Sequence, residues 1–463
     1  MSVSIFDSFL TTPDMIAAFD DAAVVQAMFA FEAALARAQA AEGLIPPAAA
    51  LAIAGVSNAQ LYDIPAIVHA GRRAGSLAIP LVKELTRTVA LYDADAARHV
   101  HWGSTSQDVL DTAMVLVTRE ALQLLDDALH DLGGHLLELA AGHLSTPVLA
   151  RTLMQPAQVT SLGFKAAGWL APLVRARGQV RAAAARALQL QLGGAVGTLS
   201  TMADHGAAVA ERVGKELRLK VADAAWHTQR DEWVRLGMEV AVLTGSLGKL
   251  ATDLSLMAQG EVAELAEPSG NGRGGSSAMP HKRNPVSSMI ALAAARRTPQ
   301  HAAALLACMG QEHERGLGNW QAELAEWPNL FLSAHGALRA LNDAFAGLKV
   351  DPERMLRNIG ALHGLVFAEA ASSYLAGAIG RPRAHALLEE LSGRAGDGHS
   401  LQALLFDAVR ADPQLAAHVD QGRLAALFDP VAAAAPARRL AEGQLHSLRM
   451  RMAALDATHP FHE

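Results

Sequence analysis

The segment GRGGSSAMPHKRNP, residues 272–285, gathers side chains that can bind an anion and move a proton. They are two adjacent hydroxyls, two fixed cations and an amide: Ser276, Ser277, Lys282, Arg283 and Asn284. The glycines allow backbone conformations that let a ligand approach the main chain. Pro285 suits the start of a helix, whose first backbone amides favour an anion. A solvated linker would tolerate the glycines and serines, but it has no use for the stiffening prolines and the Lys-x-Asn pair.

Four other polar segments interrupt the chain and could contribute to the same chemistry. They are GSTSQD (103–108), RTLMQPAQVT (151–160), WHTQRD (226–231) and QEHERGLGNWQAE (311–323). Each has an ordinary alternative when it is taken alone. The hydroxyls of the first segment are typical of a helix N-cap, and the last two segments could be charged helix faces.

Long helices must position these segments, because apolar residues recur at heptad spacing between them. The clearest stripe alternates steps of four and three: Leu236, Val240, Leu243, Leu247, Leu250, Leu254 and Met257. Similar stripes cover 109–140 and parts of 157–192 and 286–310. Such stripes indicate helices packed along their length in a bundle. Alternating strand patterns are nearly absent, so the sequence predicts an all-α fold.

The breakers between helices predict three helical domains. An N-terminal helical domain covers 1–108, a central long-helix bundle covers 109–350, and a small C-terminal helical domain covers 351–463. Long heptad helices carry more apolar surface than one chain readily covers, so we expect the central bundle to assemble into a homo-oligomer.

Charge and cysteine content limit the possible partners. The net charge of −7 gives no reason to expect nucleic acid. Cys308 is the single cysteine, so no intrachain disulfide and no thiolate metal site is expected. The first residues lack a secretory pattern, and the apolar stretches are interrupted before they reach membrane-spanning length. We expect a cytoplasmic protein with no membrane partner, no metal and no organic cofactor.

The order of the polar segments resembles the fumarase/aspartase superfamily over essentially the whole chain. GSSAMPHKRNP is close to the superfamily signature GSSxMPxKxNP, and GSTSQD and RTLMQPAQ are similar to its other two regions. The resemblance implies a homotetramer in which loops of three subunits build each active site. It also implies that Ser276 transfers the proton at carbon and that Lys282 and Asn284 bind a substrate carboxylate. Thr105, Ser106 and Gln155 fall on polar contacts to the substrate.

Two departures from the lyases of this superfamily remove titratable groups. Adenylosuccinate and argininosuccinate lyases have a Thr-His-x-Gln pattern where this chain has Thr-Leu-Met-Gln at 152–155, so Leu153 replaces the histidine. Residues 74–82 also lack the Lys-His-Asp of those lyases. An amine or hydroxyl leaving group needs a general acid, whereas a carboxylate, with a reference pKa of about 4, departs or attacks as the free anion.

These departures favour intramolecular addition of a carboxylate to a double bond. The chain resembles the branch of 3-carboxy-cis,cis-muconate cycloisomerases of protocatechuate breakdown, also in the segments that hold His227 and Arg315, two further candidates for substrate binding. The branch usually has an aromatic residue where Leu153 stands. The resemblance implies lactonisation of a small tricarboxylate in the β-ketoadipate pathway. Alternatives are an adenylosuccinate-type lyase, a cycloisomerase for another substituted muconate, or a helical scaffold without activity.

Overall fold

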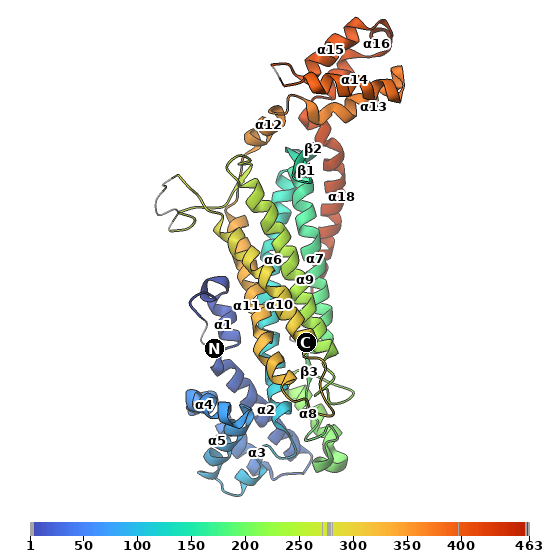
Figure 1. Ribbon diagram of the computed structural model, residues 1–463. Coiled ribbons are helices and arrows are strands. Elements are labelled where there is room, and N and C mark those ends of the chain that lie inside the picture. Colours follow the sequence, from blue (N-terminus) through green and yellow to red (C-terminus); the bar gives the residue numbers. More distant parts are fainter. Residues whose placement is uncertain are drawn as a thin grey trace.

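The computed structural model describes residues 4–270, 272–275, 279, 281–396, 398–458 and 461. The molecule is an elongated helical bundle with smaller groups of helices at its two ends (Figure 1). The N-terminal helices lie at one end, and the short helices of the C-terminal region lie at the other. The expected all-α fold is confirmed.

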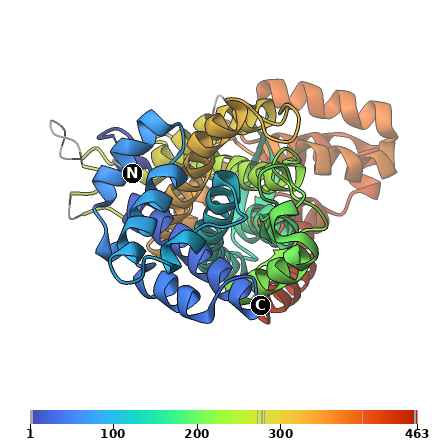
Figure 2. The same cartoon turned by 90° about the horizontal axis from the view of Figure 1, so that it is seen from below.

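Five long helices form the bundle. They are α6 (Ser106–Gly142), α7 (Leu162–Ala187), α9 (Asp231–Met257), α10 (Val286–Ala307) and α11 (Asn319–Ala346). The heptad stripe of α9 is buried along its whole length, as its spacing predicts. Viewed along the axis, the long helices enclose a common centre (Figure 2). Among the described residues, one helix, α9, is long and apolar enough to cross a membrane, but its buried stripe shows that it is a core helix of this bundle.

Helix α6 sets the length of the molecule. It has 37 residues, which at 1.5 Å per residue corresponds to about 55 Å. Thr105 is its N-cap, and the carboxylate of Asp108 accepts a hydrogen bond from the Thr105 backbone N–H at 3.0 Å. Val109, Ala113, Leu122, Leu125, Leu132 and Leu136 are buried along it. The first and last residues of α6 therefore lie at opposite ends of the bundle.

The N-terminal helices pack against the lower part of α6. They are α1 (Pro13–Ala18), α2 (Asp21–Ala41), α3 (Pro47–Val56), α4 (Ile64–Ala74) and α5 (Ala78–Ala90). Helix α8 (Gly206–Leu217) packs beside α2. One continuous apolar core joins these helices to the bundle.

The C-terminal region has an apolar core of its own between residues 371 and 424. Its helices are α12 (Pro352–Gly360), α13 (Ala368–Ile379), α14 (Arg381–Arg394), α15 (Leu401–Ala411), α16 (Pro413–His418) and α17 (Gln421–Ala426). The last helix, α18 (Pro430–Asp456), runs back along α7 (Figure 1). The division into three domains stays a proposal, in which α18 is shared between the C-terminal region and the bundle.

Short strands appear where the sequence indicates only helix breaks. Strands β1 (Pro147–Thr152) and β2 (Gln155–Ser161) form an antiparallel hairpin at the end of the bundle where α6 ends. Two-residue strands pair β3 (Gln189–Leu190) with β4 (Lys220–Val221), and β5 (Leu265–Ala266) with β6 (Lys349–Val350). The hairpin is the element that positions the 151–160 segment.

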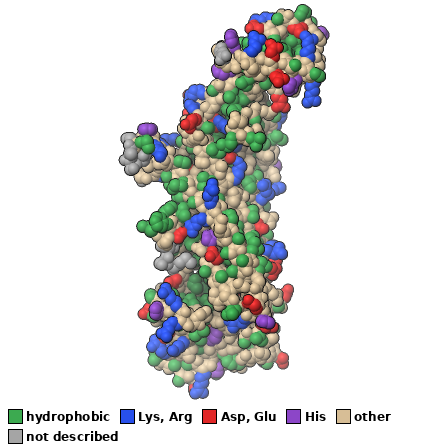
Figure 3. Space-filling model, in the orientation of Figure 1, with side chains coloured by type: hydrophobic (Ala, Val, Ile, Leu, Met, Phe, Trp, Pro, Cys, Tyr) green, Lys and Arg blue, Asp and Glu red, His purple; other side chains and the backbone are tan. Residues whose placement is uncertain are grey.

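Hydrophobic side chains reach the surface on the flank of the bundle (Figure 3). On these five helices, three large hydrophobic residues have more than half of their surface exposed: Val242 on α9, and Met289 and Leu306 on α10. Single exposed hydrophobic residues are normal on a protein surface, whereas larger apolar patches mark association surfaces.

Candidate active site

The start of α6 forms a positively charged polar site. Arg315 donates hydrogen bonds from its guanidinium to Thr105 Oγ1 at 2.6 Å and to Ser106 Oγ at 2.9 Å. A third, longer bond reaches Gln107 Oε1 at 3.3 Å. The N-terminus of a helix carries a partial positive charge of about +0.5. The guanidinium cation of Arg315 therefore lies next to the partial positive charge at the start of α6. An anion bound beside both would be stabilised by each of them.

Asp108 fixes the backbone around this site. Its carboxylate accepts hydrogen bonds from the backbone N–H groups of Gly193 at 3.0 Å and Gly194 at 2.9 Å, in addition to that of Thr105. His227 Nε2 lies 2.8 Å from Asp108 Oδ1, and the His227 residue is only 2% exposed. The structure thus brings His227 to the site, but beneath it, where the ring orients Asp108 and is shielded from solvent.

A buried charge network supports the floor of the site. Arg230 pairs with Asp111 at 2.8 Å and with Glu323, and all three side chains are about 1% exposed. Trp320 Nε1 also donates to Asp111 at 2.9 Å. Burial opposes the charge of Arg230, but the Asp111 and Glu323 carboxylates outweigh it and raise the pKa of the guanidinium. Leaving one of these charges unpaired costs about 3 to 5 kcal/mol, so the network rigidly joins α6 to α11.

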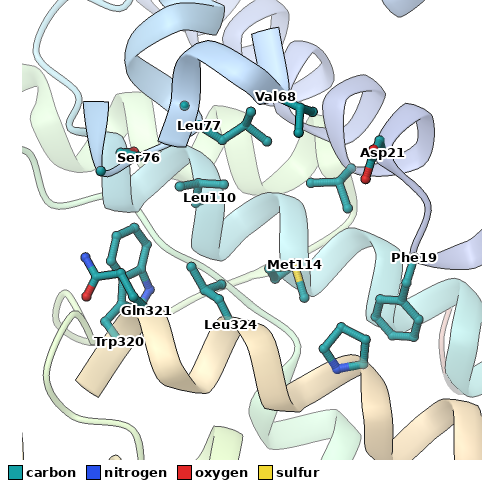
Figure 4. Close-up of a pocket in the computed structure, with 14 residues that line it drawn as sticks. Phe19, Asp21, Val68, Ser76, Leu77, Leu110, Met114, Trp320, Gln321 and Leu324 are labelled. Carbon is teal, nitrogen blue, oxygen red and sulfur yellow. The ribbon is translucent and has the colours of Figure 1, made fainter. Parts of the chain in front are cut away.

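An apolar cavity of about 380 Å³ adjoins the site (Figure 4). Leu110 and Met114, one and two turns into α6, face it from one side, and Leu324 of α11 faces it from another. Ser76 and Leu77 line it from the 74–82 segment, which supplies no titratable side chain to the cavity. The apolar lining makes this cavity a poor receptor for several carboxylates, so the charged site at the start of α6 is the better candidate.

The described residues at the base of the 272–285 loop lie beyond the opposite end of α10 from Arg315 in the same chain. Ser276 lies outside the described residues, so its proposed role rests on the sequence. Lys282 is exposed, and the Asn284 backbone N–H donates to the Gly274 carbonyl at 2.8 Å, which closes the base of the loop. Helix α10 begins at Val286, directly after this loop, and is 22 residues long. At 1.5 Å per residue, its two ends are about 33 Å apart.

The first backbone amides of α10 bind a carboxylate, as expected of a helix start, but this carboxylate is that of Glu267. The Glu267 carboxylate accepts hydrogen bonds from the backbone N–H groups of Ser287 and Ser288, both at 2.9 Å, and from Ser288 Oγ at 2.7 Å. A carboxylate from the chain itself therefore occupies the first backbone amides of this helix. The loop can still bind a substrate carboxylate, but through the side chains of Lys282 and Asn284.

The tip of the β1–β2 hairpin carries Gln155, the region-two candidate. Leu153 and Met154 form the turn with φ of 51° and 66°, and they are 97% and 71% exposed. Arg151 is paired with the buried Glu264 at 2.8 Å, and Gln158 is hydrogen-bonded to Glu369. These two pairings fix the hairpin against the rest of the chain, while the side chains of Leu153 and Met154 are exposed to solvent.

The described candidates thus lie in three parts of one chain: the start of α6, the β1–β2 hairpin, and the loop that holds Lys282 and Asn284. Thr105, Ser106 and Arg315 meet at one end of α6 with His227 beneath them. Gln155 lies at the hairpin near the other end, on the order of 50 Å away by the length of α6. In the described part of the chain, no group of three or more His, Cys, Asp or Glu side chains could hold a metal ion.

Sequence analysis missed the groups that support the site. The contacts of Asp108 with His227 and the two glycine amides, and the pairing of Arg230 with Asp111 and Glu323, involve partners far along the chain, so the sequence around each residue does not indicate them. The only usable sign was a charged residue at an otherwise apolar helix position, such as Asp111 within the stripe of α6.

Comparison with known proteins identifies the family. A family model described as lyase matches residues 9–298. The 3-carboxy-cis,cis-muconate cycloisomerase of Bradyrhizobium diazoefficiens is 46% identical, covering 95% of this chain and 97% of that protein. Nitrosuccinate lyase of Streptomyces davaonensis is 40% identical, with 89% and 88% covered. The crystal structure of 3-carboxy-cis,cis-muconate lactonizing enzyme from Pseudomonas putida superimposes with a TM-score of 0.90 at 40% identity, over 96% of this chain and 99% of that one. The chain therefore belongs to the lyase family of the fumarase/aspartase superfamily, as its sequence motifs predict.

Proposed function

We propose that this chain is an enzyme, a cycloisomerase that converts 3-carboxy-cis,cis-muconate to 4-carboxymuconolactone. Its similarity to cycloisomerases at 46% and 40% identity over nearly full length supports this activity. The observation that carries the proposal is the combination of an anion site at Arg315 with Leu153 at the position where lyases of the superfamily have histidine. The site binds carboxylates, and region two offers no acid for a leaving amine.

The reaction needs only groups that this chain supplies. One substrate carboxylate adds to the diene and forms the new carbon–oxygen bond. The displaced electron pair moves toward a second carboxylate, and Ser276 delivers a proton to the carbon beside it. Lys282 and Asn284 stabilise the negative charge that develops there. Ser276 then regains its proton from solvent, so the trianionic substrate takes up one proton in becoming the dianionic lactone, and no other co-reactant is consumed.

Each active site draws on several subunits in this proposal. One chain holds the Arg315 site and the hairpin at opposite ends, so its own Gln155 cannot reach its own Thr105. Antiparallel association through the flanks of α9 and α10 would bring the ends of different chains together and cover Val242, Met289 and Leu306. We infer a cytoplasmic homotetramer that acts on a small tricarboxylate, without an organic cofactor.

The test is a direct assay of lactonisation. Purified protein is mixed with 3-carboxy-cis,cis-muconate, the loss of diene absorbance is followed, and NMR identifies the lactone. Adenylosuccinate, nitrosuccinate and other substituted muconates serve as parallel substrates. Turnover of one of these in place of 3-carboxymuconate would overturn the proposal, and no turnover of any of them would favour a protein without activity.

A further inference from the structure

A second histidine–carboxylate pair lies beside the site and is not explained by the roles assigned so far. His101 Nδ1 is 2.6 Å from Glu32 Oε1. His101 stands four residues before Thr105, and the Ser104 backbone N–H donates to its carbonyl at 3.3 Å. The imidazole is thus attached to the same tight turn that presents the Thr105 and Ser106 hydroxyls to Arg315.

The hydrogen bond to His101 is the only interaction in the described structure that explains a carboxylate at Glu32. It lies on α2 between buried apolar residues, and its side chain is 0% exposed. Its Oε2 atom has no hydrogen-bond partner among the described residues. Burying a carboxylate is unfavourable unless it is paired. Glu32 would therefore be replaced at little loss by an apolar residue if it did not serve the imidazole.

The backbone around His101 is held in an uncommon conformation. His101 has φ of 60°, which is unfavourable for a side chain with a Cβ, and Gly103 follows with φ of 74°. Gln39 Nε2 donates to the carbonyl of Trp102, between them, at 2.6 Å. A strained position held by two side chains of α2, those of Glu32 and Gln39, is typical of a functional site.

The free face of the ring is available to a ligand. The His101 side chain is 19% exposed, and no hydrogen bond within the described residues engages Nε2. His227, in contrast, has 3% of its side chain exposed and is directed at Asp108. The charged groups that act on the His101 ring are Glu32 of α2 and Asp108 of α6. Burial disfavours the imidazolium, but these carboxylates outweigh it and raise the pKa of His101.

We propose that His101 is an additional substrate-binding residue: Glu32 holds the ring through Nδ1, and Nε2 donates a hydrogen bond to a carboxylate of the substrate. The inference rests on the proposed function. It adds a second cation to the Arg315 site, so that two carboxylates of one substrate can be bound from the same end of α6.

The experiment compares His101→Gln and Glu32→Gln with His99→Gln. His99 lies in the same segment, and no hydrogen bond in the described structure engages its ring, so its replacement is the matched control. A charge-assisted hydrogen bond to substrate predicts that His101→Gln raises KM about 10- to 100-fold with a smaller change in kcat. His99→Gln is expected to leave both constants near wild type.

Glu32→Gln separates binding from a merely structural role. The amide keeps an acceptor for Nδ1 but removes the charge that raises the pKa of His101. The wild-type kcat/KM is expected to fall as pH rises through the pKa of His101, and Glu32→Gln should move this fall to lower pH. Substrate affinity in this variant should therefore recover on acidification, which a folding defect would not do.

Binding of propane-1,2,3-tricarboxylate, measured by calorimetry and by ¹⁵N NMR of the histidine rings, gives a readout that does not need turnover. Binding is expected to shift the His101 Nε2 signal and to weaken in His101→Gln. The inference is overturned if His101→Gln matches His99→Gln in KM, in pH profile and in binding. If the wild type binds the tricarboxylate through His101 but does not lactonise 3-carboxymuconate, the proposed function alone has failed.

Discussion

Sharing of active sites between subunits can be tested by mixing two inactive variants. Arg315→Gln damages the site at the start of α6, and Ser276→Ala damages the 272–285 loop. In one chain, Asn284 at the base of the loop and Arg315 lie beyond opposite ends of α10, which is about 33 Å long. If every site combines the Arg315 end of one subunit with the loop of another, mixed oligomers must contain some sites in which both parts are intact.

The size of the gain follows from random assembly. Loss of the proton-transferring serine should lower turnover by at least about 10²-fold. Loss of the charged hydrogen bonds of Arg315 should lower kcat/KM about 10- to 100-fold. After co-refolding at equal amounts, half of the sites receive an intact Arg315 end, and half of these receive an intact loop. About a quarter of the wild-type activity should return, compared with a few per cent in either variant alone.

The matched control mixes Arg315→Gln with Thr105→Val. These residues contact each other within one chain at 2.6 Å, so each site takes both positions from the same subunit and always contains one of the two defects. This mixture should show only the mean activity of its two variants. Native mass spectrometry establishes that mixed oligomers form. The reasoning is refuted if mixed Arg315→Gln and Ser276→Ala oligomers show no gain, or if the control mixture gains as much.

Three further predictions concern single residues. Ser276→Ala should keep the helical circular dichroism spectrum while losing at least about 10²-fold in turnover; near-normal turnover would remove Ser276 from the mechanism and point to Ser277. Leu153→His should leave lactonisation unchanged or modestly lower and should not create adenylosuccinate cleavage; a several-fold increase in the lactonisation rate would show that a general acid was needed. Burial, together with Arg339, lowers the pKa of His335 to about 4 from 6.5, so its neutral form stabilises the fold above pH 6.5. This contribution is lost as pH falls toward 4, so by pH 4.5 urea titrations should show wild type losing about 2.5 kcal/mol more unfolding free energy than His335→Gln; equal losses would contradict the assignment.

The long helices were predictable because their signals are local and repeated. The stripe from Leu236 to Met257 is buried in α9 at the spacing read from the sequence. Thr105 follows the usual N-cap pattern, with Asp108 three residues later. Such patterns need only neighbouring residues, so one sequence is enough to read them.

The β1–β2 hairpin and the buried charged pairs could not be predicted from local patterns. The turn of the hairpin is made by Leu153 and Met154 with positive φ, where glycine or asparagine would be favoured. Glu32 and His101 are 69 residues apart in the sequence. Nothing local to either indicates that a buried carboxylate will meet that ring. Their pairing depends on how α2 packs beside α6.

The N-termini of α10 and α6 look alike in the sequence, but side chains of opposite charge contact them. At α10 the Glu267 carboxylate accepts from the first backbone amides, so the partial positive charge there is neutralised within the chain. At α6 the guanidinium of Arg315 adds to that charge, and Asp108 is engaged by His227 and two glycine amides. A carboxylate ligand is therefore repelled at the first terminus and attracted at the second. In the proposed assembly, the side chains of Lys282 and Asn284 would therefore act on a substrate bound at the start of α6 in another subunit.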